Sequence, residues 1–273
     1  MSILTAKNKE KVAFFDSGVG GLTVYSKFRK VLPSENCIYF GDLKHLPYGN
    51  KTKEELINYS RAIFNFFKSE NVKAVVMACN TSSAATYATV SKEFDFKIYP
   101  IIQSCAKVIA SQNIERLGIF ATESTINSGV YETEIHKHNP HIATFAQSCP
   151  NWVNIVENSA QNEPDNIQII KNDLDKMLDN QPDKIVLGCT HYPYLLDVLS
   201  KFANKDMFVD PADYFVDFIK EDLMKADLIN TQNSNGTEEF YVSANPEQFK
   251  TSSKMFYNVS SVNEIQLKEN INV

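Results

Sequence analysis

Two cysteines in this 273-residue chain stand in nearly the same local context. Residues 74–81 and 184–191 share one plan: a run rich in β-branched residues, a small residue, a cysteine, and polar residues that open a helix. The cysteines are Cys79 and Cys189. A thiolate is a base and a thiol is an acid, with an ordinary pKa of about 8.5. Two such groups can remove a proton from one face of a carbon atom and return one to the other face, although a single free cysteine is more often a small buried side chain.

The expected position of each cysteine, between a strand end and a helix start, favours the thiolate through exposed N–H groups and the helix dipole. His191 follows Cys189 by two positions and could exchange protons with it or stabilise its thiolate, while a purely structural histidine is the common alternative. His136, His138 and His141 have no carboxylate-rich motif nearby, so no metal site is predicted.

Asp16 ends another apolar run and opens a glycine-rich turn that contains Gly18, Gly20 and Gly21. Glycines allow backbone amides to approach a ligand closely, which suits a carboxylate or an ammonium group. Thr23 stands where a dinucleotide-binding fingerprint needs its third glycine, and no Gly-Lys-Ser/Thr sequence of a phosphate-binding loop follows. A helix N-cap role for Asp16 remains an alternative, and the two roles are compatible.

Short apolar runs alternate with longer amphipathic stretches, which is typical of β-α units around a parallel sheet. The clearest helix is expected over residues 53–70, and a turn at 233–237 leads into a further strand at 239–243. Strands are expected at residues 12–15, 37–40, 74–78, 97–101, 117–120, 142–145 and 184–187.

The two cysteine segments belong to an approximate internal repeat, which suggests two similar α/β domains. Asp16 precedes Cys79, and Thr122 precedes Cys189, at similar separations, and all four residues come just after predicted strands. Ligands of open α/β sheets bind beyond the carboxyl ends of the strands. Two such domains facing each other would therefore share one cleft.

The charge, the apolar runs and the cysteine count of the chain argue against several classes of protein. The net charge is −6, the pI is about 5.5, and no Lys/Arg cluster extends beyond residues 27–30, so no nucleic-acid partner is predicted. No targeting segment is predicted in the first thirty residues, and no apolar run reaches the roughly 18 residues of a membrane span. Five cysteines without a C-x-x-C pair predict free thiols in a reducing cytoplasm, and Cys37, Cys105 and Cys149 are interpreted as packing residues.

Several strings, taken together and in order, resemble the glutamate racemase family. They cover most of the chain, from near its start to past residue 210. The strings are Phe-Asp-Ser-Gly-Val-Gly-Gly-Leu-Thr-Val at 15–24, Pro-Tyr-Gly at 47–49, Ala-Cys-Asn-Thr-Ser-Ser-Ala at 78–84, Thr-x-x-Thr-Ile-x-Ser-x-x-Tyr at 122–131, Cys-Pro at 149–150, Leu-Gly-Cys-Thr-His-Tyr-Pro at 187–193 and Val-Asp-Pro-Ala at 209–212.

The resemblance implies two pseudo-symmetric parallel-sheet α/β domains with the active site in the cleft between them. The first would comprise residues 1–97 plus 210–273, and the second residues 98–209. It also implies a cofactor-independent enzyme, without metal, that forms a homodimer and supplies D-glutamate for peptidoglycan. Cys79 would act on D-glutamate with help from Asp16. Cys189 would act on L-glutamate with help from His191 and Glu157.

The same resemblance implies a set of substrate contacts. No Arg or Lys lies within the matching strings, so hydroxyls, amides and helix N-termini would hold the substrate carboxylates. Leu43, His45 and the Ile-Gln pair at 102–103 depart from the usual family residues, which puts local loop contacts and the dimer surface in doubt. The expected contacts are Asp16, Ser17, Pro47, Tyr48, Gly49, Asn80, Thr81, Thr122, Thr125, Thr190 and His191.

Three alternatives stay open on the sequence. The thiol pair would serve a racemase of aspartate or of another amino acid equally well. A two-domain protein that binds an amino acid without reaction is a second alternative, although binding alone does not need paired cysteines. A redox protein with a Cys79–Cys189 disulfide is the third.

Overall fold

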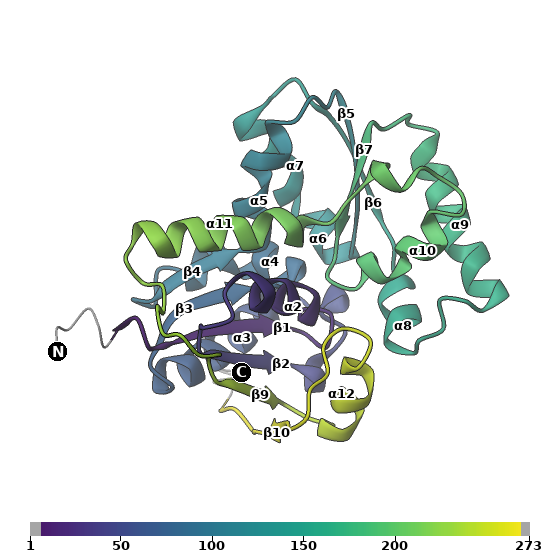
Figure 1. Ribbon diagram of the computed structural model, residues 1–273. Helices are drawn as coiled ribbons and strands as arrows, with labels where there is room; N and C mark the ends of the chain where they lie inside the picture. The colour runs from purple at the N-terminus through teal and green to yellow at the C-terminus, as the bar shows by residue number, and fades with distance from the viewer. Residues whose placement is uncertain (1–6, 269–273) are drawn as a thin grey trace.

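The computed structural model describes residues 7–268, which form two parallel β-sheets with helices around them (Figure 1). Within those residues the larger sheet has the strand order β10-β9-β2-β1-β3-β4, and the smaller has β6-β5-β7-β8. The strands are β1 (Lys11–Asp16), β2 (Cys37–Gly41), β3 (Val72–Met77), β4 (Lys97–Pro100), β5 (Arg116–Ala121), β6 (Ala143–Ser148), β7 (Lys184–Gly188), β8 (Phe208–Val209), β9 (Glu238–Val242) and β10 (Asn263–Glu264).

Helices connect the parallel strands, as parallel pairing requires. Thr52 and Glu55 form a capping box at the start of α3, which fixes where the longest helix begins. The helices are α2 (Leu22–Val31), α3 (Lys53–Ser69), α4 (Asn80–Val90), α5 (Ile101–Ala110), α6 (Glu123–Ser128), α7 (Val130–His138), α8 (Trp152–Glu157), α9 (Pro164–Leu178), α10 (Leu196–Leu199), α11 (Pro211–Lys225) and α12 (Pro246–Ser253), with 3-10 turns η1 (Leu43–His45), η2 (Tyr48–Asn50), η3 (Tyr192–Leu195) and η4 (Lys205–Met207).

Both faces of the central strands are buried, which explains why β1, β5 and β7 are largely continuous apolar runs rather than alternating ones. Along β1, Phe14 joins a central core and Phe15 joins a core on the opposite face. The central core also contains Leu117 and Ile119 of β5, so it lies between the two sheets. A third core, around Trp152, covers the outer face of the smaller sheet.

The predicted parallel-sheet α/β fold is confirmed, and each predicted strand overlaps an observed one. The chain returns to the larger sheet through α11, which packs against α2 and α5 (Figure 1). Strands from 11–100 and 238–264 form the larger sheet and strands from 116–209 form the smaller one. The exact domain boundaries stay a prediction. No helix of residues 7–268 has the length and apolar character needed to cross a membrane.

Candidate active site

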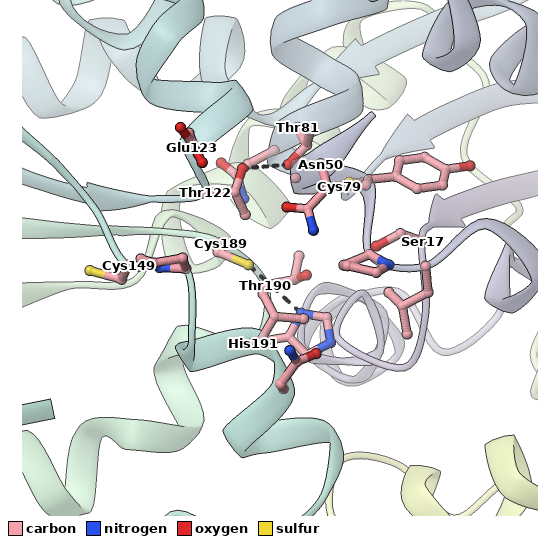
Figure 2. A pocket seen from close by; sticks show the side chains of 18 residues that line it. Ser17, Asn50, Cys79, Thr81, Thr122, Glu123, Cys149, Cys189, Thr190 and His191 are labelled. Atoms are coloured by element: carbon pink, nitrogen blue, oxygen red, sulfur yellow. Dashed lines mark hydrogen bonds between the residues drawn. The ribbon is translucent and has the colours of Figure 1, made fainter. Parts of the chain in front are cut away.

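One pocket lies where the carboxyl ends of strands from both sheets meet, with about 620 Å³ of empty space including open solvent. In Figure 2, Ser17 and Cys79 reach it from the larger sheet and Cys189 reaches it from the smaller sheet, whereas the Cys149 sulfur points away from the other labelled side chains. The lining residues are Ser17, Leu46, Pro47, Tyr48, Gly49, Asn50, Cys79, Asn80, Thr81, Thr122, Glu123, Cys149, Pro150, Val153, Asn154, Cys189, Thr190 and His191.

Cys79 follows β3 and is the N-cap of α4. Its sulfur accepts a hydrogen bond from the backbone N–H of Ser82 at 3.5 Å, which satisfies one of the free N–H groups of the helix start. Burial, and then the negative charge of Asp16, raise the pKa of the Cys79 thiol to about 12, although the Ser82 contact opposes the shift. At neutral pH this thiol therefore holds its proton until a ligand changes its surroundings.

Cys189 follows β7 and has an imidazole as its neighbour. The Cys189 sulfur lies 3.7 Å from Nδ1 of His191, and Nε2 of His191 lies 2.6 Å from Oε1 of Glu157 (Figure 2 draws the first contact). Burial lowers the pKa of His191, but the contacts with Cys189 and Glu157 outweigh it and raise the pKa well above its ordinary value. The ring therefore keeps a positive charge next to the sulfur.

Asp16 links the glycine-rich turn to the second cysteine segment. Its carboxylate accepts hydrogen bonds from the backbone N–H of Gly18 at 3.0 Å and from the hydroxyl of Thr190 at 3.1 Å. Burial raises the pKa of Asp16, while His191 and these donors lower it. A Cβ atom at Gly20 would lie 2.5 Å from Thr190 Oγ1 and 2.7 Å from the His191 ring, so a glycine here makes room for protein side chains.

Three threonine hydroxyls join the two halves at another wall of the pocket. Thr81 at the start of α4 and Thr122 at the start of α6 lie 2.9 Å apart, and Thr125 lies 2.9 Å from Thr122 and 3.3 Å from Thr81. Each hydroxyl can donate or accept, so a ligand can recruit a donor from the group by rotating one hydroxyl. Behind them, the Tyr131 hydroxyl donates to the side-chain oxygen of Asn80 at 2.6 Å.

The structure places most of the residues expected from the sequence around this pocket. Asp16, Thr125 and Glu157 are the exceptions: they lie behind the wall and contact lining residues instead. The lining residues that the sequence did not single out as site residues are Leu46, Asn50, Glu123, Cys149, Pro150, Val153 and Asn154. Cys149 and Pro150 form one of the matching strings and Glu123 lies inside another, whereas Leu46, Asn50, Val153 and Asn154 lie one to four residues from a string.

The lining carries no lysine or arginine among the described residues. The starts of helices α4 and α6 lie at the pocket instead, with backbone N–H groups that attract carboxylates. Within residues 7–268 no group of His, Cys, Asp and Glu is arranged to hold a metal ion, and all five cysteines are free thiols.

Comparisons with known proteins agree with this arrangement. A family model described as Asp/Glu/Hydantoin racemase matches residues 21–219. The chain is 38% identical to a glutamate racemase of Picosynechococcus sp., over 91% of this chain and 88% of that protein. The crystal structure of glutamate racemase from Francisella tularensis in complex with D-glutamate matches with a TM-score of 0.88 at 29% identity, covering 95% of this chain and 98% of that one. A glutamate racemase isoform from Bacillus anthracis matches with a TM-score of 0.89 at 27% identity, with the same coverage.

Two facing parallel sheets with a thiol at a strand end of each, together with these matches, define an amino-acid racemase. Within that class, the chain belongs to the glutamate racemase family.

Proposed function

We propose that this chain interconverts L- and D-glutamate, with Cys79 and Cys189 as the two acid/base residues and without pyridoxal phosphate or metal. One observation carries the proposal: the two thiols come from different sheets and line the same pocket. Inversion of a carbon centre needs a proton carrier on each side of it, and a binding protein has no use for such a pair.

The neighbours of each sulfur assign its role. Cys189, beside the charged His191, takes the α-proton of L-glutamate, and the protonated Cys79 delivers a proton to the opposite face. D-glutamate reacts by the same steps in reverse, with Cys79 as the base. In that direction the reaction starts with the proton on Cys189 and none on Cys79, and the substrate ammonium group next to Cys79 favours its thiolate form.

Residues behind the wall hold the acid/base pair in place. Glu157 orients the His191 ring through its contact with Nε2. It also keeps both ring nitrogens of His191 protonated, because a carboxylate stabilises the imidazolium form. Asp16 holds the glycine-rich turn and the second cysteine segment together through Gly18 and Thr190. Its negative charge also keeps the Cys79 sulfur protonated when no substrate is bound.

The substrate carboxylates bind without cations from lysine or arginine. The donors offered by the pocket are the start of helix α4, the start of helix α6, and the hydroxyls of Ser17, Thr81 and Thr190. Charge-assisted hydrogen bonds to such donors are roughly twice as strong as neutral ones. Glutamate is assigned over aspartate because the similar proteins are named glutamate racemases.

Incubation of the protein with L- or D-glutamate in heavy water, followed by proton NMR and circular dichroism, tests the proposal. The wild type inverts glutamate and replaces its α-proton with deuterium. Cys79→Ala and Cys189→Ala each lose inversion by at least about a thousandfold, within the range for removing an essential acid or base. Cys105→Ala, a buried thiol on α5 outside the pocket, keeps it. Inversion by both pocket variants would refute the two-thiol mechanism.

The substrate assignment has its own measurement. Aspartate reacts at least ~100-fold more slowly than glutamate, because a pocket fitted to one chain length loses about 3 kcal/mol with another. Equal rates would replace glutamate with a broader substrate class.

The cellular role follows from the product. D-glutamate would enter peptidoglycan synthesis in the cytoplasm, and the enzyme would work as a homodimer, as the family resemblance implies. A strain that lacks the gene should need D-glutamate for growth, and light scattering should give twice the mass of one chain.

A further inference from the structure

The segment that carries Tyr48, Gly49 and Asn50 forms one wall of the pocket and also touches the opposite half. A Cβ atom at Gly49 would lie 3.1 Å from Cβ of Thr122, so the segment packs tightly against the start of helix α6. A small displacement of this segment therefore changes both the substrate wall and the contact between the two halves.

Tyr48 does not direct its hydroxyl at the substrate. The hydroxyl donates a hydrogen bond to Oδ2 of Asp42, and the residue as a whole is 2% exposed. Tyr48 thus offers ring surface and neighbouring backbone to the pocket, while its polar atom anchors the segment to the end of strand β2.

Asp42 is a buried carboxylate with a second side-chain donor. Nδ1 of His45 lies 2.9 Å from Oδ1 and 2.8 Å from Oδ2 of Asp42. A carboxylate only accepts hydrogen bonds, so Nδ1 carries the proton and donates it. The backbone N–H of Asp42 donates to the carbonyl of Asp16, which ties this cluster to the glycine-rich turn.

His45 is fixed on its other side by a ring. It stacks on Tyr59 of α3 with centroids 3.8 Å apart and planes 12° apart. The preceding residue, Lys44, donates its backbone N–H to the hydroxyl of Ser243 at 2.9 Å. The imidazole therefore stands between a rigid helix and the carboxylate that anchors Tyr48.

We infer that His45 is a positioning residue for the reaction, which fixes the substrate-binding segment 47–50 through the chain His45–Asp42–Tyr48. This inference rests on the proposed function. His45 contacts Asp42 and Tyr59 but does not line the pocket, so it acts on the substrate through the segment that Asp42 anchors. The wall holds the substrate in the ground state and in the transition state alike, so its disturbance raises KM and leaves kcat nearly unchanged.

Two substitutions separate the hydrogen bond from the ring stacking. His45→Phe keeps a ring against Tyr59 and removes the donor, whereas His45→Asn keeps a donor near the position of Nδ1 and removes the ring. His45→Phe raises KM for D-glutamate about tenfold with kcat within about twofold, the size expected when a hydrogen bond to a buried charged group is lost. His45→Asn stays within about threefold of the wild-type KM, because it keeps an N–H donor for the Asp42 carboxylate.

Tyr48→Phe provides the second test, since it changes a single hydroxyl. Its KM rises like that of His45→Phe, and adding His45→Phe to it raises KM little further, because both act through Asp42. His138→Phe, an exposed site at the end of α7, is the matched control and leaves KM unchanged. Thermal unfolding of every variant shows that the protein is folded.

The outcomes separate this inference from the proposed function. If the wild type does not racemise glutamate, the function fails, and calorimetric binding of D-glutamate still tests the role of His45. If the wild type is active but His45→Phe has the same KM and kcat for D-glutamate, the inference is wrong. It is equally wrong if His45→Asn is as impaired as His45→Phe, or if the two KM effects are simply additive.

Discussion

Cys79 follows β3 and caps helix α4, whereas Cys189 follows β7 and precedes the short turn η3. The first sulfur accepts from a backbone N–H and has a carboxylate, Asp16, as its charged neighbour. The second has the imidazole of His191 as its neighbour, with Glu157 behind that ring. The strand–cysteine plan is thus repeated, and the charged neighbours are not.

The different charged neighbours of Cys79 and Cys189 explain how two cysteines can take different roles in one pocket. A negative neighbour and burial hold the Cys79 proton, and a positive neighbour stands beside Cys189. In the proposed mechanism, this difference in charged neighbours makes Cys79 the acid and Cys189 the base when L-glutamate reacts. The Thr190 hydroxyl connects the two settings, because it lies next to Cys189 in the chain and donates to Asp16.

Among the charged neighbours of the two sulfurs, the imidazole should have the largest effect when it is replaced. His191→Asn removes the positively charged neighbour of Cys189, so kcat/KM falls about a hundredfold, the lower end of the range for general acid–base residues. Circular dichroism of glutamate in both directions measures it.

The two enantiomers have equal free energies, so kcat/KM must fall equally in both directions. The asymmetry between the halves shows only in kcat and KM taken separately. An activity within threefold of the wild type would mean that Cys189 works without His191 and that the contrast between the two sulfurs is unimportant.

A second experiment changes the charged neighbour of Cys79. Asp16→Asn removes the negative neighbour of Cys79, so the pKa of Cys79 falls from about 12 and more thiolate is present at pH 9. Alkylation of Cys79 by iodoacetamide then speeds up about tenfold for each unit by which the pKa falls. Peptide mass spectrometry follows Cys79, and Cys37 in the same digest serves as a buried reference. A slower reaction at Cys79 would contradict the assigned effect of Asp16.

The strands that carry the two cysteines, and the positions of the pocket residues just after them, could be predicted from the sequence for physical reasons. Strands buried on both faces are continuous apolar runs, so β1, β3, β5 and β7 were predictable, and the residues just after them were expected at the pocket. The strands β8 and β10 were missed because two residues form no pattern.

The side-chain partners were not predictable in the same way. The bond of Tyr48 to Asp42 depends on rotamers and on the path of a loop, which periodicity does not encode. Asn50, Val153 and Asn154 line the pocket only because loops and a short helix bring them there. Their residue types carry no chemical signal of a site.

The imidazole–carboxylate pair of the second half also contributes to stability, with a defined pH dependence. Because contacts with Cys189 and Glu157 raise the folded-state pKa of His191, its stabilisation is complete below about pH 6.5 and is lost as the pH rises through the raised value. Glu157→Gln should cost about 2 kcal/mol at pH 6, the size of a hydrogen bond to a charged group, and less at high pH.

Urea unfolding from pH 6 to pH 10 measures this difference. Glu134→Gln is the matched control, because its pair with the exposed Lys137 is a surface contact worth about 0.5 kcal/mol or less. A Glu157→Gln cost that grows with pH would reverse the assigned direction of the His191 shift.

The smallest effect is expected at the mouth of the pocket, where Glu123 is an exposed lining residue at the start of α6. Its charge repels a substrate of net negative charge, but water and salt screen the interaction over a Debye length of about 8 Å at physiological ionic strength. Glu123→Gln therefore lowers KM about twofold at low salt and leaves it unchanged at high salt, where the Debye length is about 3 Å. Glu247→Gln, on the exposed face of α12 and outside the pocket, changes KM at neither salt concentration. A rise in KM with Glu123→Gln would instead make Glu123 a ligand of the substrate ammonium group.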